Sequence, residues 1–327
     1  MALIEIEDLE LDFLADGRVI RALDGVSFKI EEGETVCLVG ESGSGKSITA
    51  LSIGKLLPSP PAHYRNGRIL VGGRDVLTMG KREIRSIRGG TISYIFQEPG
   101  ASLNPVIRIG NQILEMLKLH RPEKACEDEV VQLLKLVGIP AAELRMRDYP
   151  HQLSGGMQQR IMIAMAIASH PKLLIADEPT TALDVTIQAQ IIDLLRELKE
   201  RLGMGILLIT HNLGLLRDFA DRVLVMYAGQ IVEEGSARKV LEDPLHPYTR
   251  ALLASVPQLG AEHERLISIP GSVPQLGEWP RGCRFHPRCP QRQPPCDDHV
   301  PAVIEPSLGR RVRCPYYNLE KNEPAES

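Results

Sequence analysis

The stretch "GESGSGKS", Gly40 to Ser47, constrains the fold of this chain more than any other feature. It fits the pattern G-x-x-x-x-G-K-[ST] at every fixed position. The apolar run "ETVCLVG" before it predicts a strand, and "ITALSIGKLL" after it has helical spacing. Glycines let backbone N–H groups curl around phosphate oxygens, and a helix N-terminus adds partial positive charge. A strand, a phosphate-binding loop and a helix in this order predict an α/β fold with a nucleotide site.

The residues of this phosphate loop have distinct expected roles. Lys46 would reach the β- and γ-phosphates, and the Ser47 hydroxyl would bind Mg²⁺. Contacts to the nucleotide are expected from the whole stretch, namely Gly40, Glu41, Ser42, Gly43, Ser44, Gly45, Lys46, Ser47 and Ile48. The alternative is a glycine-rich turn that binds nothing, and the flanking strand and helix argue against it.

A second stretch, "LLIADEP", ends a predicted buried strand with two acids. Asp177 is placed to hold Mg²⁺, and Glu178 to polarise an attacking water as a general base. Gln97 ends the predicted strand "TISYIFQ", and His211 follows the predicted strand "GILLIT". Both are therefore expected at the C-terminal edge of the sheet, where ligands of open α/β sheets bind. In isolation, such residues are more often ordinary loop or surface residues.

Strands alternate with helical segments along the chain, which is typical of a parallel α/β core. Residues 98–168 have mostly helical spacing, and "RVLVMYAGQIVEEG" predicts a hairpin that turns at Ala228 and Gly229. After about Leu245, prolines become dense and long periodic segments disappear. We therefore place a domain boundary there, between residues 1–245 and 246–327.

Net charge, apolar run length and the N-terminal stretch limit which partners and which location are expected for the chain. The net charge of −4 gives no general reason to expect a nucleic-acid partner. No apolar run approaches the ~18 residues of a membrane-spanning helix. The N-terminus "MALIEIEDLELDFL" is acidic where a signal peptide is basic. We expect a cytoplasmic chain whose role at any membrane comes through a partner.

The stretch "LSGGMQQR", Leu153 to Arg160, points to a family. With the phosphate loop before it and "ADEP" after it, it closely resembles the signature of ABC-transporter ATPase subunits, over about residues 3–245. The motif order matches throughout. Gln97 matches the Q-loop, Asp177 the Walker B acid, Glu178 the catalytic glutamate, "ALD" (Ala182–Asp184) the D-loop and His211 the switch histidine.

This resemblance implies a P-loop ABC ATPase: a RecA-like parallel-sheet core, an antiparallel β part and a helical subdomain at about 98–168. Two such domains dimerise head to tail, so that each ATP lies between one chain's phosphate loop and the other chain's signature. The implied catalytic residues are Lys46, Gln97, Glu178 and His211, and the implied Mg²⁺ ligands are Ser47, Gln97 and Asp177. Further nucleotide contacts are implied for Gln97, Ser154, Gly155, Gly156, Asp177 and Asp184, with Phe13 as the candidate to stack on adenine.

A finer resemblance, to the peptide-importer branch, rests on "QEPGASLNP", "YPHQLSGGM" and "HPYTRALL". It implies an ATPase that powers import of dipeptides or oligopeptides through two membrane permease subunits. A second ATPase subunit and an extracytoplasmic solute-binding protein belong to such a complex, at the cytoplasmic face of the membrane. One alternative is import of nickel or another small solute. The other is a soluble ABC ATPase outside transport, but those usually carry a long coiled coil or two fused cassettes, and this chain has neither.

Four of the six cysteines gather in residues 246–327, here called the tail: Cys283, Cys289, Cys296 and Cys314. Their gaps of five, six and seventeen residues fit neither C-x₂-C zinc spacing nor the common ferredoxin spacing. A [4Fe–4S] cluster, a structural Zn²⁺ and unligated thiols therefore all remain open. The peptide-importer resemblance favours the iron–sulfur cluster over zinc, because some members with similar tails carry one.

A metal would also explain how the tail folds. The segment from Cys283 to Cys314 is proline-rich and lacks apolar periodicity, so metal binding would supply its folding free energy. Four arginines would offset the thiolate charge, namely Arg284, Arg288, Arg311 and Arg313. We therefore expect residues 246–327 to form a small metal-binding extension.

Overall fold

The computed structural model describes residues 2–15, 17–181, 183–255 and 269–317. The chain divides into two compact units. The first unit comprises residues 1–3, 30–34 and 78–209, and the second comprises residues 4–29, 35–77 and 210–327. The boundary expected near Leu245 lies inside the second unit and stays a prediction.

Three parallel strands form the sheet of the first unit: β6 (Ile92–Ile95), β7 (Leu173–Asp177) and β8 (Gly205–Thr210). Strand β7 lies in the middle, with Ala176 opposite Ile95 and Asp177 opposite Ile209. All of β8 and the first four residues of β7 are buried. Burial on both faces explains why these strands are continuous apolar runs in the sequence.

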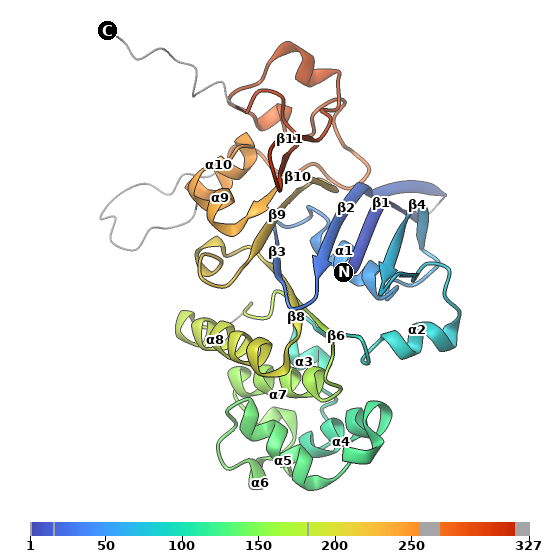
Figure 1. Cartoon of the computed structure of the whole chain (residues 1–327), viewed down its shortest axis with the longest axis vertical. Coiled ribbons are helices and arrows are strands. Elements are labelled where there is room, and N and C mark those ends of the chain that lie inside the picture. The colour runs from blue at the N-terminus through green and yellow to red at the C-terminus, as the bar shows by residue number, and fades with distance from the viewer. Residues whose placement is uncertain (1, 16, 182, 256–268, 318–327) are drawn as a thin grey trace. The chain divides into compact units, whose positions relative to one another are not determined.

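Helices make up much of the rest of the first unit (Figure 1). They are α2 (Lys81–Ile87), α3 (Pro99–Ser102), α4 (Ile109–His120), α5 (Glu127–Leu136), α6 (Ala142–Arg145), α7 (Gly155–Ile167) and α8 (Val185–Leu202), with 3-10 turns at Pro122–Lys124 and Pro150–Gln152. Helix α7 is apolar on most sides, and it contacts α3, α4, α5 and β6. It is therefore the helix around which the helical segment 98–168 packs.

An antiparallel sheet of four strands lies in the second unit, in the order β2-β1-β4-β5. The strands are β1 (Ala2–Ala15), β2 (Arg18–Glu31), β4 (Ala62–Val71) and β5 (Arg74–Asp75). In the pair β1–β4, Ile6 faces Ile69. This sheet is the antiparallel β part that the family resemblance implied.

The second unit also contains strand β3 (Thr35–Val39), which pairs in parallel with β9 (Arg222–Tyr227). The order continues β9, β10 (Gln230–Ser236), β12 (Arg310–Val312) and β11 (Ile304–Ser307), with antiparallel pairing. The predicted hairpin is confirmed, because β9 and β10 join at Ala228 (φ 43°) and Gly229 (φ 79°). Two positive φ angles are typical of a tight hairpin turn that matches the strand twist.

The helices of the second unit are α1 (Lys46–Ile53), α9 (Ala237–Glu242) and α10 (Pro247–Ala254), with 3-10 turns at Leu213–Leu215, His286–Arg288 and Pro294–Asp297. Across the described ranges of both units, no helix is long and apolar enough to cross a membrane.

A buried carboxylate on β10 holds the start of α10. The two oxygens of Glu233 accept hydrogen bonds from the backbone N–H groups of Leu245 and His246, each at 2.8 Å. The His246 Nδ1 atom in turn accepts from the N–H of Tyr248 at 3.0 Å. Burial lowers the pKa of His246 to about 3, so its ring is neutral and free to accept this bond. The sequence "HPYTRALL" is thus a capped helix fixed to the sheet.

The tail is anchored by strand pairing and by a buried aromatic side chain, although its sequence led us to expect that metal binding would supply its folding free energy. Strand β12 pairs with β10, and the Phe285 side chain is only 1% exposed. Its ring packs against those of Tyr227 and Tyr248, with ring centroids 5.3 Å away in each case. Contacts far apart in sequence, which apolar periodicity cannot reveal, anchor this segment.

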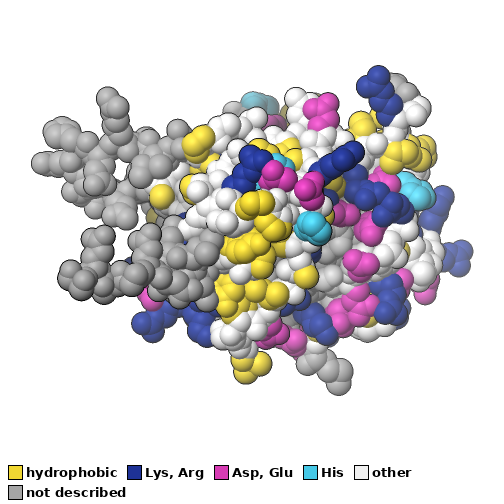
Figure 2. Space-filling view, turned by 90° about the horizontal axis from the view of Figure 1, so that it is seen from above, with side chains coloured by type: hydrophobic (Ala, Val, Ile, Leu, Met, Phe, Trp, Pro, Cys, Tyr) yellow, Lys and Arg dark blue, Asp and Glu magenta, His cyan; other side chains and the backbone are white. Residues whose placement is uncertain are grey.

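On the face shown in Figure 2, Lys and Arg side chains are interspersed with Asp and Glu side chains. Exposed ion pairs of this kind include Arg217–Glu242 at 2.8 Å and Arg238–Glu242 at 3.0 Å. Such exposed pairs contribute little to stability.

We predict that Glu233→Ala lowers the free energy of unfolding by about 3 kcal/mol, because it leaves two buried N–H groups without their acceptor and removes one of the carboxylates that pair with Arg310. Urea denaturation followed by circular dichroism measures this change. The matched control is Glu242→Ala, which removes an exposed acid and should leave the urea midpoint nearly unchanged. Equal midpoints for the two variants would contradict the role given to Glu233.

Candidate functional site

The phosphate loop leaves the buried strand β3 and enters helix α1 within the second unit. Gly40 has φ 151°, and a Cβ there would lie 2.2 Å from the backbone oxygen of Met226 on β9. Gly45 has φ 107°, and its Cβ would lie 2.8 Å from the Met226 methyl group. Only glycine fits either position, so strand β9 presses the loop into its curled shape.

The inside of the loop is arranged for an anion. The Lys46 ammonium group donates to the backbone oxygens of Gly40 and Glu41, at 2.8 and 2.9 Å. The Ser44 hydroxyl is buried and has no hydrogen-bond partner among the described residues. A buried hydroxyl without a partner is costly, and phosphate oxygens would satisfy it. The side chains of Ser42 and Ser47 are exposed, so a ligand can reach them.

The two acids and the predicted glutamine lie in the first unit. Glu178 follows β7 directly, and its carboxylate accepts hydrogen bonds from Thr181 Oγ1 at 2.9 Å and from Gln97 Nε2 at 3.3 Å. Adjacent parallel strands β6 and β7 bring these groups to one edge, as we had expected from the sequence. Glu178 has φ 47°, a left-handed conformation that is rare outside glycine and that often marks functional positions. Asp177 ends β7 and is half-buried.

The signature residues form the N-terminus of α7. Ser154 is its N-cap, and its hydroxyl accepts from the N–H of Met157 at 3.4 Å. Ser154 and Gly155 are exposed, whereas a Cβ on Gly156 would lie 3.1 Å from the Ile187 side chain of α8. Asp184 caps α8 by accepting from the N–H of Ile187 at 2.9 Å. Ala182, the first residue of the expected D-loop, is outside the described residues.

Two other predicted site residues belong to the second unit. His211 follows the end of β8, and its side chain is exposed. Phe13 lies on β1 opposite Ala62 and is partly buried. Their roles toward a nucleotide stay predictions.

The four tail cysteines come near one another in the second unit. The backbone N–H of Cys283 donates to the backbone oxygen of Cys296 at 2.8 Å. Burial raises the pKa of Cys314 to about 11, and the charges that Cys283, Cys289 and Cys296 would carry act in the same direction. The structure thus clusters the four side chains that the sequence singled out.

The structure gives no support to the expected metal-binding extension. Within the described ranges, no three His, Cys, Asp or Glu side chains are arranged to hold a metal ion. Neither a [4Fe–4S] cluster nor Zn²⁺ is needed to explain how the tail is anchored, because Phe285 and strand β12 already anchor it. The expected ligands were Cys283, Cys289, Cys296 and Cys314.

The tail arginines were expected to offset thiolate charge, and most of them pair elsewhere. Arg284 pairs with Asp24, Arg288 with Glu41, and Arg311 with Glu234. Arg313 donates to the backbone oxygens of Pro301 and Ile231. The tail is therefore joined to the rest of the second unit by charge as well as by packing.

Sequence reasoning missed three side chains that contact predicted site residues within one or the other unit. Thr181 binds the Glu178 carboxylate, whereas Tyr248 and Arg288 bind Glu41 of the phosphate loop. The signal for Tyr248 was present in "HPYTRALL", which no requirement of ATP chemistry explained. No comparable signal pointed to Arg288.

Comparison with known proteins agrees with this geometry. A family profile described as "ABC transporter" matches residues 23–181, and one described as "Oligopeptide/dipeptide transporter, C-terminal region" matches residues 232–296. The chain is 48% identical to the oligopeptide transport ATP-binding protein AppD of Bacillus subtilis, covering 98% of both chains. It is 46% identical to the dipeptide transport ATP-binding protein DppD of Haemophilus influenzae, covering 100% of this chain and 99% of the relative.

Solved structures give the same result for the fold. The dimeric post-hydrolysis structure of the ATP-binding cassette MJ0796, bound to ADP and Pi, matches with a TM-score of 0.64 and 29% identity. It covers 72% of this chain and 99% of that chain. The P-loop ABC ATPase fold, with its mixed sheets and helices, is thereby confirmed.

The chain is an ABC-transporter ATPase, whose class couples ATP hydrolysis to transport. More narrowly, it belongs to the family of oligopeptide/dipeptide transporter ATP-binding proteins.

Proposed function

We propose that this chain hydrolyses ATP to power the import of peptides through a membrane permease complex. The observation that carries the proposal is the similarity over the whole chain to oligopeptide and dipeptide transport ATP-binding proteins, including the tail that the peptide-transporter profile matches. Peptides are thus the proposed solute class, and the binding protein and permease would choose among them.

In the proposed mechanism, the phosphate loop binds ATP with Lys46 at the β- and γ-phosphates. Ser47, Asp177 and Gln97 would hold Mg²⁺, which when bound neutralises charge on the phosphate oxygens. Glu178 takes the proton of the attacking water while the water oxygen bonds to the γ-phosphorus and the bond to the bridging oxygen breaks. The hydrogen bonds from Thr181 and Gln97 support this role, because they orient the Glu178 carboxylate. His211 is assigned to stabilise charge on the γ-phosphate.

The proposed assembly pairs this chain with a second ATPase subunit, so that the signature at Ser154, Gly155 and Gly156 acts on the nucleotide of the partner. The dimeric cassette among the similar structures supports this arrangement. Two permease subunits would anchor the pair at the cytoplasmic face of the membrane, and an extracytoplasmic binding protein would deliver the peptide.

We predict that Glu178→Gln keeps ATP binding and lowers the turnover rate by at least ~10²-fold, because only the general base is lost. The measurement is phosphate release by the purified complex, together with equilibrium binding of ATP. The matched control is Glu200→Gln, an exposed acid on α8 that should leave both unchanged. Near-normal turnover by the Glu178→Gln variant would contradict the assignment of Glu178 as the general base.

We further propose that the four tail cysteines bind one metal centre when the metal is supplied, most simply a [4Fe–4S] cluster and otherwise Zn²⁺. What supports this is the clustering of Cys283, Cys289, Cys296 and Cys314 within one partly buried region. Metal binding would require the thiols to move from the arrangement described.

Metal analysis of anaerobically purified protein tests this centre. We expect about four irons per chain and a brown sample for the cluster. About one zinc per chain in a colourless sample would select the alternative. Cys289→Ser should lose the metal, whereas Cys126→Ser, at an exposed cysteine outside the tail, should retain it. Finding neither iron nor zinc in the parent protein would end the proposal.

A further inference from the structure

The tail contacts the phosphate loop at Glu41. Glu41 is the second residue of the loop, and both of its oxygens accept hydrogen bonds from the Arg288 guanidinium, at 2.8 and 2.9 Å. The backbone N–H of Glu41 donates to the Tyr248 hydroxyl at 2.8 Å. Its backbone oxygen accepts from Lys46. Every polar group of Glu41 is thus engaged, and two of its partners come from residues after 245.

Arg288 is held rigidly for this contact. Its side chain is only 5% exposed, and it lies in the 3-10 turn just before Cys289. Besides Glu41, the guanidinium donates to the backbone oxygen of Pro270 at 2.8 Å and to the Tyr227 hydroxyl at 3.3 Å. A planar, bidentate and largely buried ion pair fixes orientation as well as distance, which a lysine could not do.

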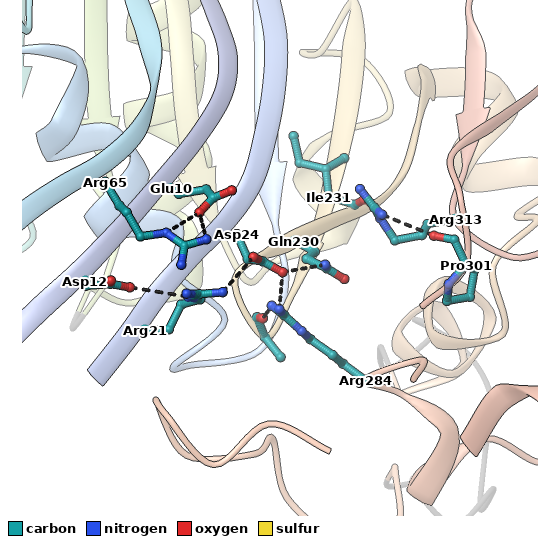
Figure 3. Close-up of polar contacts among 11 residues, drawn as sticks. Glu10, Asp12, Arg21, Asp24, Arg65, Gln230, Ile231, Arg284, Pro301 and Arg313 are labelled. Carbon is teal, nitrogen blue, oxygen red and sulfur yellow. Dashed lines mark hydrogen bonds and ion pairs between the residues drawn. The ribbon is translucent and has the colours of Figure 1, made fainter. Parts of the chain in front are cut away.

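A second tail arginine, Arg284, contacts Asp24 and the turn between β9 and β10 (Figure 3). Arg284 donates to the backbone oxygen of Ala228 and to Asp24, and its guanidinium lies 3.5 Å from the centroid of the Trp279 ring. The next residue of that turn, Gly229, donates its N–H to the backbone oxygen of Ser44 in the phosphate loop at 2.8 Å. The turn at Ala228 and Gly229 thus contacts both Arg284 of the tail and Ser44 of the phosphate loop.

The charge of Glu41 gives the ion pair a consequence for ligand binding. Lys46, assigned to the phosphates, donates to the backbone oxygen of Glu41. A carboxylate that belongs to the phosphate loop repels a triphosphate bound there, because like charges repel more strongly at short separation. Pairing with Arg288 cancels that repulsion while keeping the loop in place.

We propose that Arg288 is a positioning residue for nucleotide binding: it holds Glu41, fixes the start of the phosphate loop and neutralises a carboxylate that would otherwise repel the phosphates. This inference rests on the proposed role of the loop as the ATP site. It gives the tail a role in nucleotide binding that is separate from any role in binding a metal.

The test compares binding of the non-hydrolysable analogue AMPPNP and of ADP to the purified full chain by titration calorimetry. Arg288→Met should weaken AMPPNP binding about tenfold, and ADP binding less, because ADP carries one negative charge fewer. Adding Glu41→Gln to Arg288→Met should restore most of the lost affinity, since the repelling charge is then gone. A purely structural role for Arg288 predicts no such rescue.

The control is Arg292→Met, which breaks an exposed pair with Asp297 in the same part of the tail and should leave both affinities unchanged. If Arg288→Met does not fold, Arg288→Lys replaces it, and we expect a smaller loss that is still greater for AMPPNP than for ADP. Wild-type affinity in the variant that folds, or a double variant as weak as Arg288→Met, overturns the inference. Failure of the parent protein to bind either nucleotide would instead contradict the proposed function.

Discussion

The close approach of the phosphate loop to strand β9 is the constraint on which the rest of the site depends. A Cβ on Gly40 would lie 2.2 Å from the Met226 backbone oxygen, and the loop cannot move away, because β3 and β9 are paired along their length. The turn after β9 adds the hydrogen bond from Gly229 to Ser44. The curled backbone that would receive phosphates is therefore fixed by a strand almost two hundred residues later in the chain.

The tail extends this support. Strand β12 continues the sheet beyond β10, and the Phe285 ring packs against Tyr227 and Tyr248, whose rings also pack against each other. Tyr248 and Arg288 then bind Glu41 at the start of the loop. The segment that distinguishes the peptide-transporter branch is thus part of the same folded unit as the phosphate loop, and truncating it would remove contacts on which that loop relies.

Local motifs could be predicted from the sequence because their geometry is local. The glycines at positions 40 and 45 indicate positive φ angles. A buried strand that is followed by two acids, Asp177 and Glu178, places them at a sheet edge. The meeting of Gln97 with Glu178 followed from adjacent parallel strands, once both were expected to be strands. The hairpin at Ala228 and Gly229 was likewise local.

Long-range pairing could not be predicted in this way. The bond between Arg288 and Glu41 joins residues 247 positions apart, and no periodicity in either segment encodes it. For the same reason, the tail arginines were assigned to thiolates instead of to carboxylates. The tail lacks apolar periodicity, yet one buried phenylalanine and one paired strand suffice to anchor it.

The central claim, that this chain turns ATP hydrolysis into peptide import, is tested most directly in proteoliposomes. The complete complex, with its permease subunits and binding protein, would be reconstituted with ATP on the side of the ATPase and labelled peptide on the other. The account predicts that the peptide-loaded binding protein stimulates hydrolysis and that labelled peptide accumulates with ATP but not with AMPPNP. Hydrolysis that ignores the loaded binding protein, with no accumulation of any peptide tested, would contradict it.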